Sequence, residues 1–334
     1  MNPPGSQCRP LRKAGPSFTF FGMKTLLGLI AATLLGSIPS VAVNLFPIST
    51  APIVLTNAGE YYLTQDLIIT NPAPVVAIRI AVSNVVLNLN GRIVRYIGPA
   101  DPVFVLRNGI EAPFNSVVRD GRVRGWSNTG IILAGFDGIQ PVAGAGVIDN
   151  VGVHECGVGI AAAGGTLRRC LVRDSARDGF VVTSSRLTSC VSRGNETGFH
   201  GHETNVFTRC RSSGNMVGFE LEGGNVLDRC DSRRNTHVGL VLQSGSGAAV
   251  SRSVIARNGS AGIDIEMDSQ SALIQGNRII HNGYGEDPLF GALIINGKGT
   301  RAEGNRLIRN SPNTIVDNGI DSEIVDNIFV PRIH

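Results

Sequence analysis

The chain has 334 residues, of which 17% are charged, 5% are aromatic and 42 are glycines. Its formal net charge of +4 at pH 7 is too small to indicate nucleic-acid binding, and no alternation of aromatic and basic residues supports such binding. Abundant glycine with few large side chains instead favours tight coils in which small side chains stack.

The beginning of the chain has the pattern of an export signal. Lys24 follows a second methionine, Met23, and an apolar run extends from Leu26 to Ile38 before the small residues of Ser40–Ala42. A positive start, a short apolar stretch and a small-residue cleavage site define a secretory signal peptide. The apolar run is too short to be a membrane-spanning helix.

This pattern divides the chain into three regions. We expect residues 1–22 to be an upstream extension from a misassigned start, residues 23–42 to be the signal peptide, and residues 43–334 to form one domain. No later apolar stretch is long enough to cross a membrane, so the protein should be secreted or periplasmic after signal removal. We expect a monomer.

A 20-residue repeat becomes regular between residues 167 and 234. Cysteines recur every 20 residues, at Cys170, Cys190, Cys210 and Cys230. Each has leucine or phenylalanine three residues before it, serine or asparagine five residues after it, and then glycine with an apolar partner. A period of about 20 residues is typical of a β-solenoid, since helical repeats have periods above about 30. We therefore predict an all-β fold, a parallel β-helix of about a dozen rungs.

Alternation within each rung predicts which residues point inward. After each glycine, apolar residues such as Phe180 and Val182 should point inward and their neighbours outward. The cysteine column should also point inward and continue as Ser253, Asn277, Asn305 and Asn327. A further column lies at the bend, where asparagine tolerates left-handed backbone and can hydrogen-bond between rungs. Its members are Asn195, Asn215, Asn235, Asn258, Asn282 and Asn310.

Export makes the state of the cysteines a question, because exported proteins commonly contain disulfides. Neighbouring rungs lie about 4.8 Å apart. Parallel side chains in one column would keep their Cβ atoms about as far apart, beyond the usual limit for a disulfide. We therefore expect Cys170, Cys190, Cys210 and Cys230 to be buried free thiols rather than one or two disulfides. Cys156 lies in a different column and should be unpaired.

The rungs resemble the parallel β-helix repeat of the pectate-lyase-like superfamily, in its bacterial secreted form. Besides the asparagine column, the likeness is carried by Gly59–Leu67, Val86–Gly91 and Val118–Gly121, and it covers about residues 50–330. The resemblance implies a right-handed helix, but the superfamily contains lyases, hydrolases, epimerases and proteins with no known activity. The Gly-His-Gly motif of polygalacturonase-type enzymes is absent, because His200–His202 reads His-Gly-His.

The outward residues after the glycines carry the candidate chemistry. Neighbouring rungs have alanine, valine or threonine at these positions, whereas the central rungs carry histidines and acids. Outward neighbours along a strand lie about 6.6 Å apart and those on adjacent rungs about 4.8 Å apart. His200 should therefore lie beside Glu220, and His202 beside Glu222. The six candidate catalytic residues are His200, His202, Glu220, Glu222, Asp264 and Glu266.

Several kinds of chemistry fit this face. A carboxylate pair could hydrolyse a glycosidic bond, with Glu220 or Glu222 as the acid and a histidine as base or orienter. A histidine beside a glutamate could instead remove a sugar C5 proton, as in a lyase or epimerase. The cluster could also bind a divalent metal, and calcium would prefer the all-oxygen group Glu222, Asp264 and Glu266. No cofactor is firmly implied, and an inert solvated face is the remaining interpretation.

Arginines and one insertion supply candidate substrate-binding residues. Arg209 and Arg229 lie beside the cysteine column, and Arg211 lies on the next outward column. Arginine binds carboxylate or sulfate through two parallel hydrogen bonds, so an acidic polysaccharide could lie along these columns. The insertion that contains Tyr284 and Phe290 enters one rung beyond Asp264 and could overhang the candidate site.

These observations lead to two hypotheses. The first is an exported protein that acts on or binds polysaccharide, as a glycoside hydrolase, lyase or epimerase that uses the outward histidines and acids. The second is a non-catalytic structural or ligand-binding protein of the envelope or cell surface. Scarce aromatic residues favour the second hypothesis, because sugar sites usually contain stacking aromatics, whereas the two histidines favour the first.

Overall fold

The computed structural model describes residues 45–70, 76–98, 107–112, 115–133, 135–137, 140–142, 146–284, 291–312 and 314–331. The expected upstream extension and signal peptide lie outside these residues, as does Phe290. The described residues form 37 strands and no helix. Accordingly, they contain no helix that is long and apolar enough to cross a membrane.

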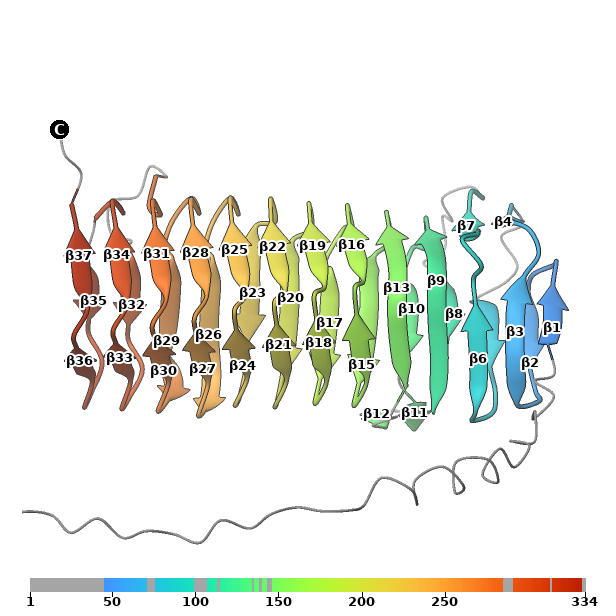
Figure 1. The fold of residues 1–334 in the computed structure, drawn as a ribbon, viewed down its shortest axis with the longest axis horizontal. Coiled ribbons are helices and arrows are strands. Elements are labelled where there is room, and N and C mark those ends of the chain that lie inside the picture. Colours follow the sequence, from blue (N-terminus) through green and yellow to red (C-terminus); the bar gives the residue numbers. More distant parts are fainter. Residues whose placement is uncertain are drawn as a thin grey trace, which may run out of the picture. The chain divides into compact units, whose positions relative to one another are not determined.

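One sheet contains twelve parallel strands, each paired with the equivalent strand of the next rung (Figure 1). Its strands are β2 (Ile53–Leu55), β5 (Val76–Ile80), β8 (Asn108–Glu111), β10 (Thr129–Leu133), β14 (Val158–Ala163), β17 (Phe180–Thr183), β20 (Thr197–His202), β23 (Val217–Leu221), β26 (Leu240–Ser246), β29 (Ile263–Gln270), β32 (Leu293–Ile295) and β35 (Ile315–Asp317).

The other large sheet contains 23 strands in two rows, which share the long strands β9 (Ser116–Arg124) and β13 (Val147–His154). The first row also contains β1 (Leu45–Ile48), β3 (Gly59–Leu63), β6 (Val85–Asn88), β15 (Thr166–Arg168), β18 (Arg186–Thr188), β21 (Val206–Thr208), β24 (Val226–Asp228), β27 (Ala249–Ser251), β30 (Leu273–Gln275), β33 (Arg301–Glu303) and β36 (Glu323–Val325). The second row also contains β4 (Leu67–Ile69), β7 (Ile93–Tyr96), β16 (Leu171–Arg173), β19 (Val191–Arg193), β22 (Arg211–Ser213), β25 (Asp231–Arg233), β28 (Val254–Ala256), β31 (Arg278–Ile280), β34 (Arg306–Ile308) and β37 (Ile328–Val330).

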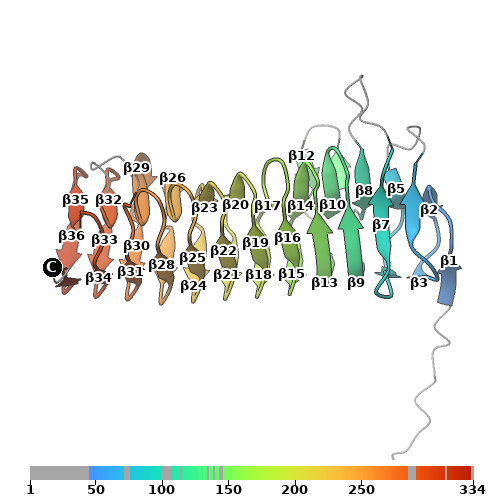
Figure 2. The same cartoon turned by 90° about the horizontal axis from the view of Figure 1, so that it is seen from above.

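Each regular rung passes through the first row, the second row and then the twelve-stranded sheet, as in β18, β19 and β20. The views in Figures 1 and 2 show the rungs side by side in chain order. Among the described strands, only β11 (Gly135–Asp137) and β12 (Gln140–Val142) pair antiparallel. The predicted parallel β-helix of about a dozen rungs is therefore confirmed.

The interior follows the predicted alternation. Phe180, Phe199 and Phe219 are buried on successive rungs, and their rings stack with centroids 4.7 Å apart at each step. Offset stacking of aromatic rings adds to the stabilisation from burying their area. Gly201 occupies the inward position of β20 that Val182 and Leu221 fill on the adjacent rungs.

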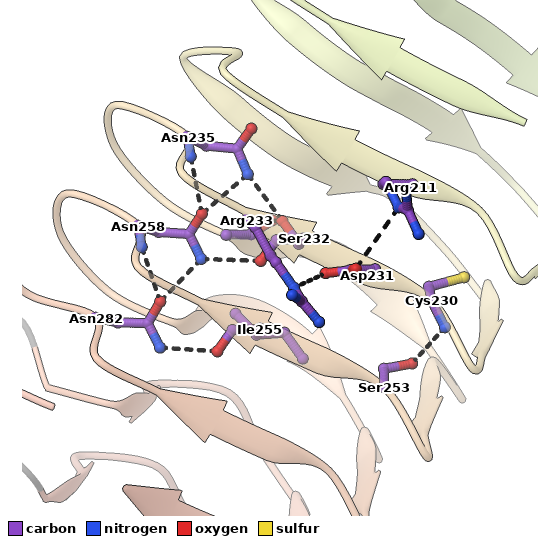
Figure 3. A network of polar contacts seen from close by, with 11 residues as sticks. Arg211, Cys230, Asp231, Ser232, Arg233, Asn235, Ser253, Ile255, Asn258 and Asn282 are labelled. Atoms are coloured by element: carbon purple, nitrogen blue, oxygen red, sulfur yellow. Dashed lines mark hydrogen bonds and ion pairs between the residues drawn. The ribbon is translucent and has the colours of Figure 1, made fainter. Parts of the chain in front are cut away.

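The asparagine column forms the expected ladder between rungs (Figure 3). At each step an asparagine Oδ1 accepts a hydrogen bond from the backbone N–H of the preceding rung at 2.7–3.1 Å, from Ser175 N–H through to Asn310 Oδ1. The expectation that these asparagines are left-handed is wrong. Positive φ occurs one residue earlier, at +58° in Asp174, +54° in Arg234 and +58° in Arg257. Because each asparagine points inward to bridge the rungs, the preceding residue makes the bend.

The cysteine column is also as predicted. Cys156, Cys170, Cys190, Cys210 and Cys230 are free thiols and are buried. The column continues as a second ladder, in which Cys230 N–H donates to Ser253 Oγ at 3.0 Å and Ser253 N–H donates to Asn277 Oδ1 at 2.9 Å. Burial raises the pKa of the Cys156 thiol to about 11. These cysteines therefore serve as small core residues.

Candidate functional site

The six candidate catalytic residues lie on or directly beside the outward face of the twelve-stranded sheet. His200 on β20 pairs in register with Glu220 on β23, as expected. The same column then continues through Val241 on β26 to Asp264 on β29. Regular stacking of the rungs therefore brings residues 64 positions apart onto one short column.

Gly201 takes the inward position between the two histidines, which strand alternation places together on the outward side of β20. A Cβ at this position would lie 3.0 Å from a methyl of Leu221 and 3.1 Å from Oδ1 of Asn225, tighter than ordinary contacts. The glycine thus lets the strand lie close over the next rung. On the opposite side, the rings of His200 and His202 are 4.3 Å apart.

Glu222 connects both histidines. Its Oε2 lies 2.9 Å from Nδ1 of His202, which is a hydrogen bond between two residues that were predicted to lie side by side on adjacent rungs. Its Oε1 lies 3.8 Å from Nε2 of His200. The contact with His202 lowers the pKa of Glu222, so this carboxylate is ionised at neutral pH. Glu222 can therefore accept a proton or orient His202, but it is unsuited to be a general acid.

Asp178 is a member of the site that the sequence analysis missed. Its Oδ1 lies 3.8 Å from Nδ1 of His200, and both side chains are mostly buried, at 21% and 22% exposure. Asp178, followed by Glu220 and Glu222, raises the pKa of His200 against the effect of burial. The position of Asp178 two residues before Phe180 could have identified it. The predicted alternation of inward and outward residues, however, began only at Gly179.

Atom Nε2 of His200 is buried and has no hydrogen-bond partner among the described residues. A buried polar atom without a partner is costly unless a ligand or water supplies one. When the ring is protonated, this nitrogen has a proton to donate. His200 thus combines an available donor with an elevated proton affinity.

Glu220 has a different environment from the one expected. Thr197 Oγ1 donates to its Oε2 at 2.9 Å, and Gln243 Nε2 donates to its Oε1 at 2.7 Å. Both carboxylate oxygens therefore have partners within the protein. Glu220 supports the site electrostatically and is less available than Glu222 for direct chemistry.

The two acids on β29, Asp264 and Glu266, lie in different environments. Burial, followed by Glu266, raises the pKa of Asp264 to about 6, and Oδ1 of Asp264 is buried without a partner. The pairing of β26 with β29 shifts register after Leu242, and Glu266 is exposed at this irregularity. Burial and the charges of Glu220 and Asp268 raise the pKa of Glu266. Of the candidate acids, Asp264 is therefore the one best suited to hold a proton in mildly acidic solution.

A metal could be held by only one of the predicted groups. The candidate ligand atoms of His200, His202 and Glu222 all lie within 4.8 Å of one another, and no other such group of three occurs among the described residues. The expected calcium group of Glu222, Asp264 and Glu266 is not brought together among the described residues and stays a prediction. Glu222 bonds to His202 instead, and Glu266 is exposed at the β29 irregularity.

The predicted substrate-binding residues do not form one group. Arg209 and Arg229 have φ of +54° and +53° at the turn between the two rows, and Arg229 lies 3.9 Å from Asp228. Arg211 lines a hollow on the second row. The hydroxyl of Tyr284 donates to the carbonyl of Arg309 at 3.1 Å, which connects Tyr284 to the second-row edge of a later rung.

The chain is thus a parallel β-helix protein with a polar cluster on the outward face of one sheet. Residues 156–329, just over half of the chain, match the family model described as the right handed beta helix region. The chain belongs to this family, which confirms the predicted handedness and the resemblance to pectate-lyase-like proteins. No curated protein sequence matches the chain.

Solved structures with the same fold include enzymes and phage proteins. The A-module of the mannuronan C-5 epimerase AlgE4 from Azotobacter vinelandii is 18% identical, with a TM-score of 0.65 over 83% of this chain and 89% of that one. A variant of the periplasmic alginate epimerase AlgG is 13% identical, with a TM-score of 0.67 over 84% and 77%. A mutant tailspike of E. coli bacteriophage HK620 in complex with a pentasaccharide is 13% identical, with a TM-score of 0.59 over 81% and 60%. At these identities the likeness shows the fold.

Proposed function

We propose that this protein acts on a polysaccharide by transferring protons at a sugar carbon, with His200 and His202 as the acid–base pair. The observation that carries the proposal is the arrangement around Glu222, which bonds to His202 at 2.9 Å and lies 3.8 Å from His200. One carboxylate thus organises two histidines whose rings are 4.3 Å apart. The reaction class is that of a lyase or an epimerase.

The roles follow from the contacts of each ring. When His202 is neutral and donates its Nδ1 proton to Glu222, its Nε2 is left with a free electron pair and can act as the base. His200 has its pKa raised by Asp178 and the nearby glutamates, so it is suited to return a proton. In an epimerisation the proton removed from carbon is replaced by another. In an elimination the glycosidic C–O bond breaks instead.

Hydrolysis by the glutamate pair is less well supported by the geometry. An inverting or retaining hydrolase needs one carboxyl group that is protonated next to the leaving oxygen. Glu222 has a lowered pKa, and both oxygens of Glu220 already accept hydrogen bonds. Asp264 and Glu266 are the remaining candidate carboxyl groups, and the pKa values of both are raised.

Two further observations support polysaccharide as the substrate class. The site lies on an open face of stacked rungs, along which a linear polymer can extend. The similar structures include epimerases of mannuronan and alginate and a tailspike in complex with a pentasaccharide. The signal-peptide pattern of residues 23–42 further suggests that the protein meets such polymers outside the cytoplasm.

The test is to incubate the protein with neutral, uronate and sulfated polysaccharides in D2O. Deuterium at a sugar carbon without chain cleavage would indicate epimerisation, and absorbance from unsaturated uronates would indicate elimination. New reducing ends without unsaturation would replace the proposal with hydrolysis. The absence of deuterium incorporation and of cleavage across the panel would favour the non-catalytic binding or structural hypothesis.

A metal-binding role is the second candidate, favoured by the cluster of His200, His202 and Glu222. Two imidazoles and one carboxylate are a ligand set suited to zinc or a similar divalent transition metal. In this role Glu222 would be a metal ligand beside the two histidines, and would no longer serve only to orient His202. Glu222 therefore accepts a hydrogen bond from His202 in the first candidate function and binds a metal in the second.

A further inference from the structure

A hollow of about 600 Å³ opens on the outward side of the second row, on a different sheet from the candidate site. It crosses β19, β22, β25, β28 and β31. We call it the arginine groove, because its lining contains Arg193, Arg211, Arg233, Arg234, Arg257 and Arg278.

Short side chains create the hollow. Asp231 and Arg233 on β25 pair in register with Val254 and Ala256 on β28. On the next rung Val254 pairs with Arg278. The small apolar residues of β28 therefore form a floor, with longer arginine side chains on the rungs to either side.

The groove has far more positive than negative charge. Asp231 is the one carboxylate in its lining, and it pairs with Arg233 at 2.5 Å and with Arg211 at 3.7 Å (Figure 3). The other four arginines form no ion pair with a carboxylate of the described residues. Like charges in a shared concave site repel each other unless an anion lies between them.

Two of these arginines also occupy unfavourable backbone positions. The corner that follows each second-row strand has positive φ, and Gly194 and Gly214 fill it on two rungs. On the next two rungs the same corner holds Arg234 and Arg257, with φ of +54° and +58°. Non-glycine residues are uncommon in this conformation unless their side chain can hydrogen-bond locally. Arginines with positive φ also occur at the corner between the two rows, as at Arg209 and Arg229, so this conformation is not specific to the groove. At Arg234 and Arg257 it places charge in the groove lining.

We propose that the arginine groove binds an acidic polysaccharide chain through its carboxylate or sulfate groups. Its arginines come from five successive rungs, which span about 19 Å at about 4.8 Å per rung. Arginine forms paired, charge-assisted hydrogen bonds with such groups. A linear polymer with repeated anionic groups matches this extended row of cations better than a single small anion.

The lining argues against nucleic acid as the occupant. Proteins that bind single strands use aromatic side chains on which bases stack, and the groove contains no phenylalanine, tyrosine or tryptophan. Its floor of Val254, Ala256 and Ile280 instead offers apolar contact to the faces of sugar rings. This proposal rests on the proposed function only for the class of polymer that is bound. The groove and the His200 cluster lie on different sheets.

The test measures binding of the full-length protein to polygalacturonate, heparin, neutral dextran and single-stranded DNA at low ionic strength. The groove variant is Arg234→Asn with Arg257→Asn. Its matched control is Arg169→Asn with Arg252→Asn, which removes the same charge from positions that also have positive φ but lie outside the groove. Asparagine tolerates this backbone conformation, so both variants should fold.

We expect the groove variant to bind acidic polymers about tenfold or more weakly, because charge-assisted contacts are lost. The control should change by about twofold or less. Preference for polygalacturonate or for heparin would identify carboxylate or sulfate as the bound group. Equal weakening of both variants, equal binding of DNA, or no binding of either acidic polymer would overturn the proposal. His200→Gln should remove the proposed proton transfer without changing this binding, so the two proposals can fail separately.

Discussion

His202 and Glu222 lie 20 residues apart in the chain and are joined by a 2.9 Å hydrogen bond between neighbouring rungs. The bond orients the His202 ring and lowers the pKa of Glu222. Glu222 also lies within 3.8 Å of His200, so its charge affects both rings. The proposed chemistry therefore depends on the regular stacking of the rungs, which brings these two side chains into contact.

Replacing Glu222 with glutamine should lower kcat on the active polymer by about 100-fold or more, because the base loses its orienting charge. Steady-state kinetics would measure this loss, with KM expected to change much less. Glu196→Gln is a suitable control, since Glu196 is an exposed carboxylate before β20. Equal kcat values for the two variants would contradict the role of Glu222.

Asp178→Asn should lower the pKa of His200, because Asp178 is the main cause of its upward shift. NMR titration of the His200 ring would measure the change. An unchanged titration would show that Asp178 does not control this histidine.

The same variant should change the dependence of stability on pH. A histidine whose pKa is raised on folding stabilises the protein below its unfolded pKa, and this contribution is lost as pH rises through the folded pKa. Asp178→Asn should therefore cost more stability at about pH 5.5 than at about pH 8.5. Urea unfolding at both values would measure the difference, and an equal or reversed effect would contradict the linkage.

Zinc binding tests the alternative role of the cluster. If His200, His202 and Glu222 hold a metal, the protein should bind zinc in calorimetry, and His200→Ala or His202→Ala should weaken that binding. His237→Ala is a control, because His237 is exposed and outside the cluster. A chelator that leaves polysaccharide turnover unchanged, together with equal zinc binding by all variants, would exclude this role.

Asn235→Ala should destabilise the fold by about 3 kcal/mol, because buried donors and acceptors would lose their partners. Asn235 accepts from Asn215 N–H at 3.1 Å and donates to Ser232 and Asn258, both at 2.9 Å. The urea midpoint would measure the loss. Asn318→Ala, which removes an exposed amide contact with Asn296, should cost about 0.5 kcal/mol or less. Similar losses in both variants would contradict the structural importance of the ladder.

The five buried cysteines should not react with a thiol reagent in the folded protein. Burial raises the pKa of Cys156 to about 11, and Cys170 and Cys210 are shifted well above their usual range. Thiolate is the reactive form, so burial and protonation both slow labelling. Complete labelling should require denaturant. Fast labelling of the folded protein would contradict burial, and missing thiols in denaturant would reveal disulfides.

Much of this structure could be predicted because the rungs stack in register. The 20-residue spacing of the cysteines predicted the rung, and alternation predicted that Phe180, Phe199 and Phe219 would stack inward. The same reasoning correctly placed His200 beside Glu220 in register. It failed where side-chain rotation or a local irregularity decided the partner. Glu220 bonds to Thr197 and Gln243, and the left-handed residue precedes the ladder asparagine.

The sequence by itself determined the period, the inward columns and the face on which the histidines and acids lie, because these depend on strand alternation and stacking. Only the tertiary structure decided that Asp178 approaches His200 and that Glu222 serves both histidines. It also revealed that the small residues Val254 and Ala256 open a groove between arginines. Such contacts depend on side-chain lengths and rotamers across several rungs, which a repeat pattern does not specify.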